Sequence, residues 1–194
     1  KGRAPAQPAA VMFFSQPAAL AALPELEPPE IAAMRALLPG PLTLLLPNRR
    51  HRFPLACDPR AAQAGVSSTG APSSTPAAHV SSAGAPSPPP AAHASTLGLR
   101  VPALPEPLAA LAAVDLPLLQ SSANLSGGPD ARRLADVPES IRAGADLVLD
   151  GGELPGVAST VLDLRRYASA GEWTVVREGP MRAPEIASRL AESA

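Results

Sequence analysis

The chain is poor in aromatic residues, in cysteine and in excess charge, and each shortage excludes a class of protein. Only 3% of its 194 residues are Phe, Trp or Tyr, so the core must be built from Leu, Val and Ala. The single cysteine, Cys57, excludes an intrachain disulfide framework and suits a reducing compartment. A net charge of −1 excludes a global basic field that would gather nucleic acid. No apolar run approaches the length of a membrane span, and we therefore expect a cytoplasmic protein without a membrane segment.

Two common kinds of catalytic site are also missing from the sequence. It contains neither a recognisable Ser/His/Asp constellation nor a His/Cys cluster with metal-ligand spacing. The sequence therefore predicts no metal ligands of its own and no covalent enzyme intermediate.

Residues 61–95 differ in composition from the rest of the chain. Two nearly identical units of Pro, Ala, Ser and Gly follow one another, from Ser67 to His79 and from Ser81 to His93. Such a segment buries too little apolar surface to offset its ordering entropy, so we expect it to be disordered. The two histidines could form a metal pair, but the duplication explains them more simply. We expect one domain from residues 1–60 and 96–194, interrupted by this insertion.

The remaining sequence alternates between short apolar runs and helical patterns, which predicts a mixed-sheet α/β fold. The last two strands should pair as a hairpin. Asp136 and Glu139 form a capping-box pattern at the start of a short helix that Gly144 would end. Strands are expected at 11–14, 42–46, 96–102, 116–121, 146–150, 159–164 and 172–177, and helices at 29–38, 106–114, 138–144 and from 184 onward.

A polar stretch from Gln120 to Pro129 follows the apolar run Leu116–Leu119, which we interpret as a buried strand. In open α/β sheets ligands lie in the crevice beyond the carboxyl ends of strands. Small polar side chains and glycine also let backbone N–H groups approach an anion closely. The stretch therefore predicts a ligand site, with an ordinary polar turn as the alternative.

Several short motifs, taken in their order along the chain, resemble one family. The chain resembles the YrdC/Sua5 family, the L-threonylcarbamoyladenylate synthases. This resemblance implies an α/β fold, a YrdC-like single domain with a twisted mixed β-sheet flanked by helices. The motifs are Lys-x-Arg at Lys1 and Arg3, Pro39-Gly40-Pro41-Leu42-Thr43, Gly98-Leu99-Arg100-Val101-Pro102, Ser-x-Asn at Ser122 and Asn124, Ser159-Thr160-Val161, and Arg177-Glu178-Gly179.

The resemblance implies a nucleotidyltransferase that joins L-threonine, bicarbonate or CO2 and ATP into threonylcarbamoyl-AMP and releases pyrophosphate. Mg2+ is expected to accompany the ATP. The product would pass to a tRNA threonylcarbamoyl transferase complex, which makes N6-threonylcarbamoyladenosine (t6A) in tRNA. Contact with tRNA or other double-stranded RNA is a further implication.

The same resemblance implies roles for individual residues. Cations must surround the phosphates of ATP and the bicarbonate ion. Arginine suits their oxygens because its guanidinium makes two-point contacts. Arg100 is also suggestive on its own, because a half-buried arginine in an apolar strand needs an anionic partner. For Thr43, packing is an alternative, and Ser159 and Thr160 could simply open a strand. The implied catalytic residues are Lys1 and Arg3, and the implied ATP- and phosphate-binding residues are Thr43, Arg100, Ser122, Asn124, Ser159, Thr160 and Arg177.

The sequence also departs from the family pattern. A Pro-Thr-x-Thr-x-Tyr-Gly-Leu type motif stands ahead of Lys-x-Arg in the family and is not found here, and Gln7 replaces a usual lysine. We therefore expect an N-terminally incomplete domain. The alternative functions are a non-catalytic remnant that binds nucleotide or double-stranded RNA, and an unstable fragment.

Overall fold

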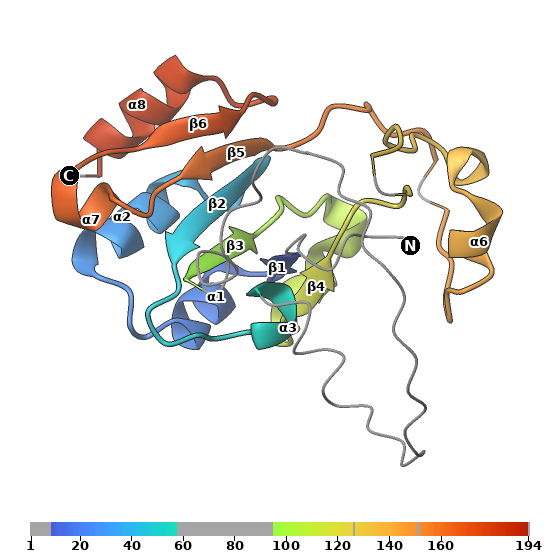
Figure 1. Cartoon of the computed structure of the whole chain (residues 1–194), viewed down its shortest axis with the longest axis horizontal. Coiled ribbons are helices and arrows are strands. Elements are labelled where there is room, and N and C mark those ends of the chain that lie inside the picture. Colours follow the sequence, from blue (N-terminus) through green and yellow to red (C-terminus); the bar gives the residue numbers. More distant parts are fainter. Residues whose placement is uncertain (1–8, 58–94, 126, 151, 194) are drawn as a thin grey trace, which may run out of the picture.

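The computed structural model describes residues 9–57, 95–125, 127–150 and 152–193 (Figure 1). Within these residues six strands form one mixed sheet in the order β4-β1-β3-β2-β5-β6. The pairs β1·β3 and β2·β5 are parallel, and the other neighbours are antiparallel. This confirms the predicted fold class. The strands are β1 (Ala10–Met12), β2 (Leu42–Pro47), β3 (Thr96–Arg100), β4 (Leu118–Gln120), β5 (Thr160–Asp163) and β6 (Thr174–Arg177).

Helices of very different length connect the strands. The two longest α-helices, α2 and α8, pack against each other beside the sheet (Figure 1). None of the described helices is long and apolar enough to cross a membrane. The helices are α1 (Gln16–Ala22), α2 (Pro28–Leu37), α3 (Pro54–Cys57), the 3₁₀ helices η1 (Glu106–Ala113) and η2 (Leu134–Asp136), α6 (Glu139–Arg142), α7 (Tyr167–Ala170) and α8 (Ala183–Ala191).

The two faces of the sheet have different roles, as the alternation along β2 shows. Leu42, Leu44 and Leu46 are fully buried, whereas Thr43 and Leu45 point to the opposite face and are only partly buried. The buried face joins the helices in one core of mostly aliphatic side chains. Its other members include Val11, Phe13, Met34, Leu37, Leu97, Leu99, Leu162, Ile186 and Leu190.

Most predicted elements are found close to their expected positions. The helix at 29–38, the strand at 42–46, the C-terminal hairpin and the last helix are confirmed. The segment predicted as a helix at 106–114 is the 3₁₀ helix η1. Helix α1 was not predicted, although Ser15 marks its start, because its alanine-rich sequence has little apolar periodicity.

Two predictions about apolar runs are wrong. Leu116–Leu119 is not a buried strand, because β4 lies at the edge of the sheet and Leu119 is 53% exposed. The predicted strand at 146–150 is irregular, and Leu147 and Leu149 are largely exposed. No described strand pairs with that segment, and an apolar run without a pairing partner gains no ladder of backbone hydrogen bonds.

The predicted capping box between Asp136 and Glu139 is also wrong. The Asp136 carboxylate accepts a hydrogen bond from the backbone N–H of Arg133 (3.1 Å), which closes the turn of η2. Helix α6 then begins separately, after the extended residue Pro138. Asp136 therefore caps the turn of η2, because the first turn of a helix leaves backbone N–H groups, here that of Arg133, without a partner inside the helix.

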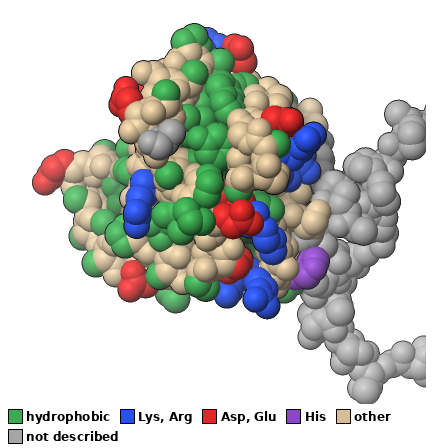
Figure 2. Space-filling model, turned by 90° about the vertical axis from the view of Figure 1, so that its left-hand side faces the viewer, with side chains coloured by type: hydrophobic (Ala, Val, Ile, Leu, Met, Phe, Trp, Pro, Cys, Tyr) green, Lys and Arg blue, Asp and Glu red, His purple; other side chains and the backbone are tan. Residues whose placement is uncertain are grey.

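Acidic and basic side chains are interspersed on the face of the molecule shown in Figure 2. Arg49 binds both Glu30 (2.8 Å) and Glu27 (2.9 Å), and Arg52 binds Glu25 (2.8 Å). Residues 61–94 of the predicted insertion lie outside the described residues, as do Lys1 and Arg3.

Candidate functional site

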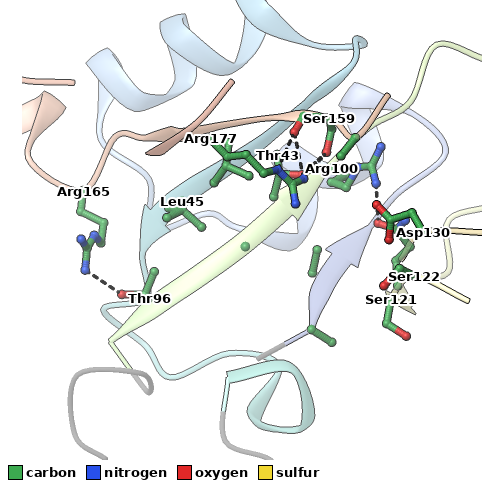
Figure 3. Close-up of a pocket in the computed structure, with 16 residues that line it drawn as sticks. Thr43, Leu45, Thr96, Arg100, Ser121, Ser122, Asp130, Ser159, Arg165 and Arg177 are labelled. Carbon is green, nitrogen blue, oxygen red and sulfur yellow. Dashed lines mark hydrogen bonds between the residues drawn. The ribbon is translucent and has the colours of Figure 1, made fainter. Parts of the chain in front are cut away.

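A hollow of about 590 Å3 lies over the face of the sheet opposite the helices (Figure 3). Its residues come from all six strands, from the segments on either side of β5 and from the segment that follows β4. The polar stretch predicted as a ligand site contributes Gln120, Ser121 and Ser122 to this hollow, which rests on the sheet face itself. Small side chains on that face leave the space open.

The floor of the hollow follows from the register of three neighbouring strands. Ala10 of β1 is paired with Gly98 of β3, and Gly98 is paired with Leu45 of β2. All three line the hollow. We call Ala10, Gly98 and Leu45 the apolar strip. A side chain at position 98 would project into the hollow, so glycine keeps the strip flat.

Thr43, Ser159 and Arg177 form a hydrogen-bonded group beside the apolar strip. The hydroxyl oxygens of Thr43 and Ser159 lie 3.0 Å apart. Arg177 donates from Nη2 to the backbone oxygen of Ser159 (2.9 Å) and to its hydroxyl (3.3 Å). The register explains the group, since Val161 of β5 pairs with both Thr43 and Arg177. Carbonyl and hydroxyl oxygens orient the Arg177 guanidinium without neutralising it.

Arg100 reaches the same hollow from the end of β3. Its Nη1 donates to Oε1 of Gln120 (2.8 Å), while its Nε is buried without a hydrogen-bond partner. Burial, and then the positive charge of Arg177, hold the pKa of Arg100 below its ordinary value. Among the described residues no carboxylate forms an ion pair with Arg100 or Arg177. Two guanidinium groups without a directly paired carboxylate in one hollow are suited to a polyanionic ligand.

The Ser-x-Asn motif forms a turn at the edge of the hollow. Ser122 donates its hydroxyl hydrogen to Oδ1 of Asn124 (2.5 Å). Asn124 in turn donates from Nδ2 to the backbone oxygen of Gly128 (2.7 Å) and to Asp130 (3.3 Å). Ser122 and Asp130 line the hollow, whereas Asn124 holds the turn together behind them.

Thr160 lies away from the other predicted site residues. Its side chain is fully buried, and its hydroxyl donates to the backbone oxygen of Met181 (2.8 Å). The neighbours Ser159 and Val161 line the hollow, and Thr160 does not. Of the described candidates, the structure therefore brings Thr43, Arg100, Ser122, Ser159 and Arg177 to one hollow, with Asn124 supporting it.

Several residues of the hollow, among them Gln120, Asp130 and Arg165, were not among the individual site residues predicted from the sequence. Gln120 ends β4 and binds Arg100, and only its place before the Ser-x-Asn motif could have indicated it. Arg165 lines the hollow at the end away from Ser122 (Figure 3). Its Nε donates to Asp163 (2.9 Å), a pairing two residues apart that resembles an ordinary surface ion pair in sequence.

A family model and solved structures show which proteins this chain is similar to. The family model Sua5_yciO_yrdC, described as "Telomere recombination", matches residues 1–179. The chain belongs to this family. Its fold also matches P. abyssi Sua5 complexed with L-threonine, with a TM-score of 0.64 and 25% identity over 99% of this chain and 46% of that one. A doubly substituted P. abyssi Sua5 gives the same score and identity over 97% of this chain and 46% of its own.

The structural match covers nearly all of this chain but less than half of P. abyssi Sua5. The chain spans about half the length of P. abyssi Sua5. No curated protein matches the chain. Family membership therefore establishes the kind of domain.

Proposed function

We propose that this domain synthesises threonylcarbamoyl-AMP from L-threonine, bicarbonate or CO2, and ATP, with release of pyrophosphate. The observation that carries the proposal is the pair Arg100 and Arg177. Both line one hollow without a carboxylate partner among the described residues, next to the hydroxyls of Thr43 and Ser159. Membership of the family supports the assignment.

The chemistry requires alignment and charge stabilisation more than reactive side chains. The threonine nitrogen bonds to the carbon of CO2 and loses a proton, which gives a carbamate. A carbamate oxygen then attacks the α-phosphorus, and the bond to the pyrophosphate oxygen breaks. Arginine side chains stabilise the charge on the phosphate oxygens, and hydroxyl groups hold the reactants in line. In this proposal Arg100, Arg177 and Ser159, which line the hollow, supply these contacts.

Mg2+ is the metal expected with the ATP. It is usually held by one or two carboxylates together with substrate phosphates. Asp130 supplies a carboxylate at the rim of the hollow, and the described residues include no cluster of three or more metal-ligating groups. This donor set fits a metal that arrives with the nucleotide, where it would neutralise phosphate charge, and Asp130 is the residue that would hold it.

Threonine and the fate of the product follow from the same proposal. P. abyssi Sua5 has been solved with L-threonine, which supports threonine as the amino-acid substrate. Threonylcarbamoyl-AMP is a mixed anhydride that can acylate an amine. We propose that a tRNA threonylcarbamoyl transferase complex in the cytoplasm consumes it to form t6A in tRNA.

The test is pyrophosphate release from ATP, measured with the full chain and with the longest natural form of the protein. We expect release only when L-threonine and bicarbonate are both present. Arg177→Ala should lower the rate at least a hundredfold. Arg182→Ala is the matched control, because Arg182 is exposed and pairs with Glu178. Threonine-independent release, or none from the folded longest form, would overturn the proposal. Salt-sensitive retention of double-stranded RNA without pyrophosphate release would instead support a binding remnant.

A further inference from the structure

The peptide unit that joins Ser159 to Thr160 is hydrogen-bonded at both of its polar atoms. Its carbonyl oxygen accepts from Nε (3.1 Å) and from Nη2 (2.9 Å) of Arg177, which lies beside Ser159 in Figure 3. Its N–H donates to the backbone oxygen of Pro41 (3.0 Å). Because a peptide unit is planar, the bond to Pro41 also fixes the direction of the carbonyl group that binds Arg177.

Thr160 anchors this peptide unit a second time through its side chain. The side chain is fully buried, does not line the hollow, and donates its hydroxyl hydrogen to the backbone oxygen of Met181 (2.8 Å). Met181 belongs to the segment that follows β6, and Arg177 is the last residue of that strand. The hydroxyl therefore holds the start of β5 and the end of β6 at a fixed separation.

Gly179 permits the close approach of the same two segments. A Cβ at this position would lie 2.5 Å from the backbone oxygen of Ala158 and 2.6 Å from the carbonyl carbon of Ser159. Both are backbone atoms, so they cannot rotate away as the end of a flexible side chain can. Any other residue at position 179 would push the segment after β6 away from the peptide unit.

Arg177 is thus oriented by a peptide unit and not by a carboxylate. Its Nε and Nη2 both bind Ser159, and no described residue accepts a hydrogen bond from its Nη1. Since Arg177 lines the hollow, Nη1 is left for a ligand there. Phosphoryl transfer depends on alignment, so a small displacement of this guanidinium would lower the rate.

We propose that Thr160 and Gly179 are positioning residues, which aim the Arg177 guanidinium by fixing the Ser159–Thr160 peptide unit. Neither of them lines the hollow, and both act through Arg177. The effect on rate rests on the proposed function, whereas the fixed geometry of Arg177 can be measured without it.

Thr160→Val tests the proposal, because valine keeps the β-branched shape and removes the hydroxyl. The readout is hydrogen exchange of the Arg177 Nε–H, followed by NMR in the full chain. Exchange should be about tenfold faster in Thr160→Val and within about twofold of wild type in Thr160→Ser, which keeps the hydroxyl. Ile186→Val is the matched control, because it removes one methylene from the core without touching the peptide unit.

Pyrophosphate release from the longest natural form of the protein gives a second readout. Thr160→Val should lower kcat about tenfold when Arg177 is present. In the Arg177→Ala background it should lower kcat less than about twofold, because its effect passes through the missing side chain. A merely structural role of Thr160 would lower kcat equally in both backgrounds, which would contradict the proposal.

Gly179→Ala is the second variant and should also accelerate exchange of the Arg177 Nε–H. The wild-type chain is informative by itself, since this Nε–H should exchange about tenfold more slowly than that of the exposed Arg182. Equal exchange at the two arginines, unchanged exchange at Arg177 in folded Thr160→Val, or equal acceleration in Ile186→Val would overturn the inference alone. Absence of threonine-dependent pyrophosphate release from the wild type would overturn the proposed function, and exchange would still decide whether Thr160 positions Arg177.

Discussion

Arg100 and Arg177 direct two positive charges into one hollow, although 77 positions separate them in the sequence (177 − 100). Burial and the charge of Arg177 both lower the pKa of Arg100. This arrangement opposes folding when the hollow holds no anion, because like charges repel and one of them is half buried. Binding an anion relieves that cost. The pair therefore contributes to binding more than to stability.

Arg100→Ala should weaken ATP binding at least tenfold while changing the free energy of unfolding by less than about 1 kcal/mol. The variant loses the hydrogen bond to Gln120 but also relieves the repulsion from Arg177. Calorimetry measures the first quantity and urea unfolding the second. A loss of several kcal/mol with unchanged ATP affinity would contradict the assignment.

Glu30 and Arg49 form the most buried ion pair of the described residues. Glu30 is fully buried and accepts from Nη1 and Nη2 of Arg49 at 2.9 and 2.8 Å. Arg49→Ala would leave this carboxylate buried without its cation, and we expect a loss of about 3 kcal/mol in urea unfolding. Glu27→Ala is the comparison, since the half-exposed Glu27 binds the same arginine and should cost about 1 kcal/mol or less. Equal losses in the two variants would contradict the importance of burial.

Alanine substitutions at Leu162 and Leu149 test which apolar runs belong to the core. Leu162 of β5 is fully buried, whereas Leu149 is 80% exposed. Leu162→Ala should cost about 2–5 kcal/mol of unfolding free energy, because it leaves a cavity. Leu149→Ala should stay within about 0.5 kcal/mol. A large loss from Leu149→Ala would mean that residues 146–150 are a core strand after all.

The buried thiol of Cys57 should make the free energy of unfolding fall as the pH rises. Burial raises the pKa of its thiol, although a hydrogen bond from Asn48 (3.3 Å) partly offsets this. The folded state therefore holds the proton more tightly than the unfolded chain. The resulting stability is fully present below about pH 8.5 and is lost as the pH rises through the folded pKa. Urea unfolding at pH 7.5 and 9.5 should show this decrease, and Cys57→Ala should reduce it. An identical decrease in the variant would exclude Cys57 as its source.

The sequence predicted well those elements whose local pattern agrees with their environment. Leu42–Pro47 alternates between core and hollow, and Ile186 and Leu190 lie one helical turn apart on the buried side of α8. Two apolar runs were wrongly predicted to be buried strands, Leu116–Leu119 and residues 146–150. Local composition does not reveal whether another strand lies beside such a run. Edge position is a property of the whole sheet order, which no local pattern encodes.

The site could be predicted only in part, for a related reason. The motifs identified Arg100, Ser122, Ser159 and Arg177, and the structure gathers all four at one hollow. They could not show that the hollow lies on the sheet face, because that depends on the register of several strands. Arg165 was missed since its partner lies two residues away and gives it the pattern of a surface pair.

The central claim is that one hollow on the open face of the sheet holds a nucleoside triphosphate. A crystal structure of the protein with a non-hydrolysable ATP analogue tests it most directly. We expect the nucleotide to lie in this hollow, with its phosphates in contact with Arg177 and the polar groups around it. A nucleotide bound elsewhere, or a hollow that stays empty at saturating nucleotide, would contradict the account.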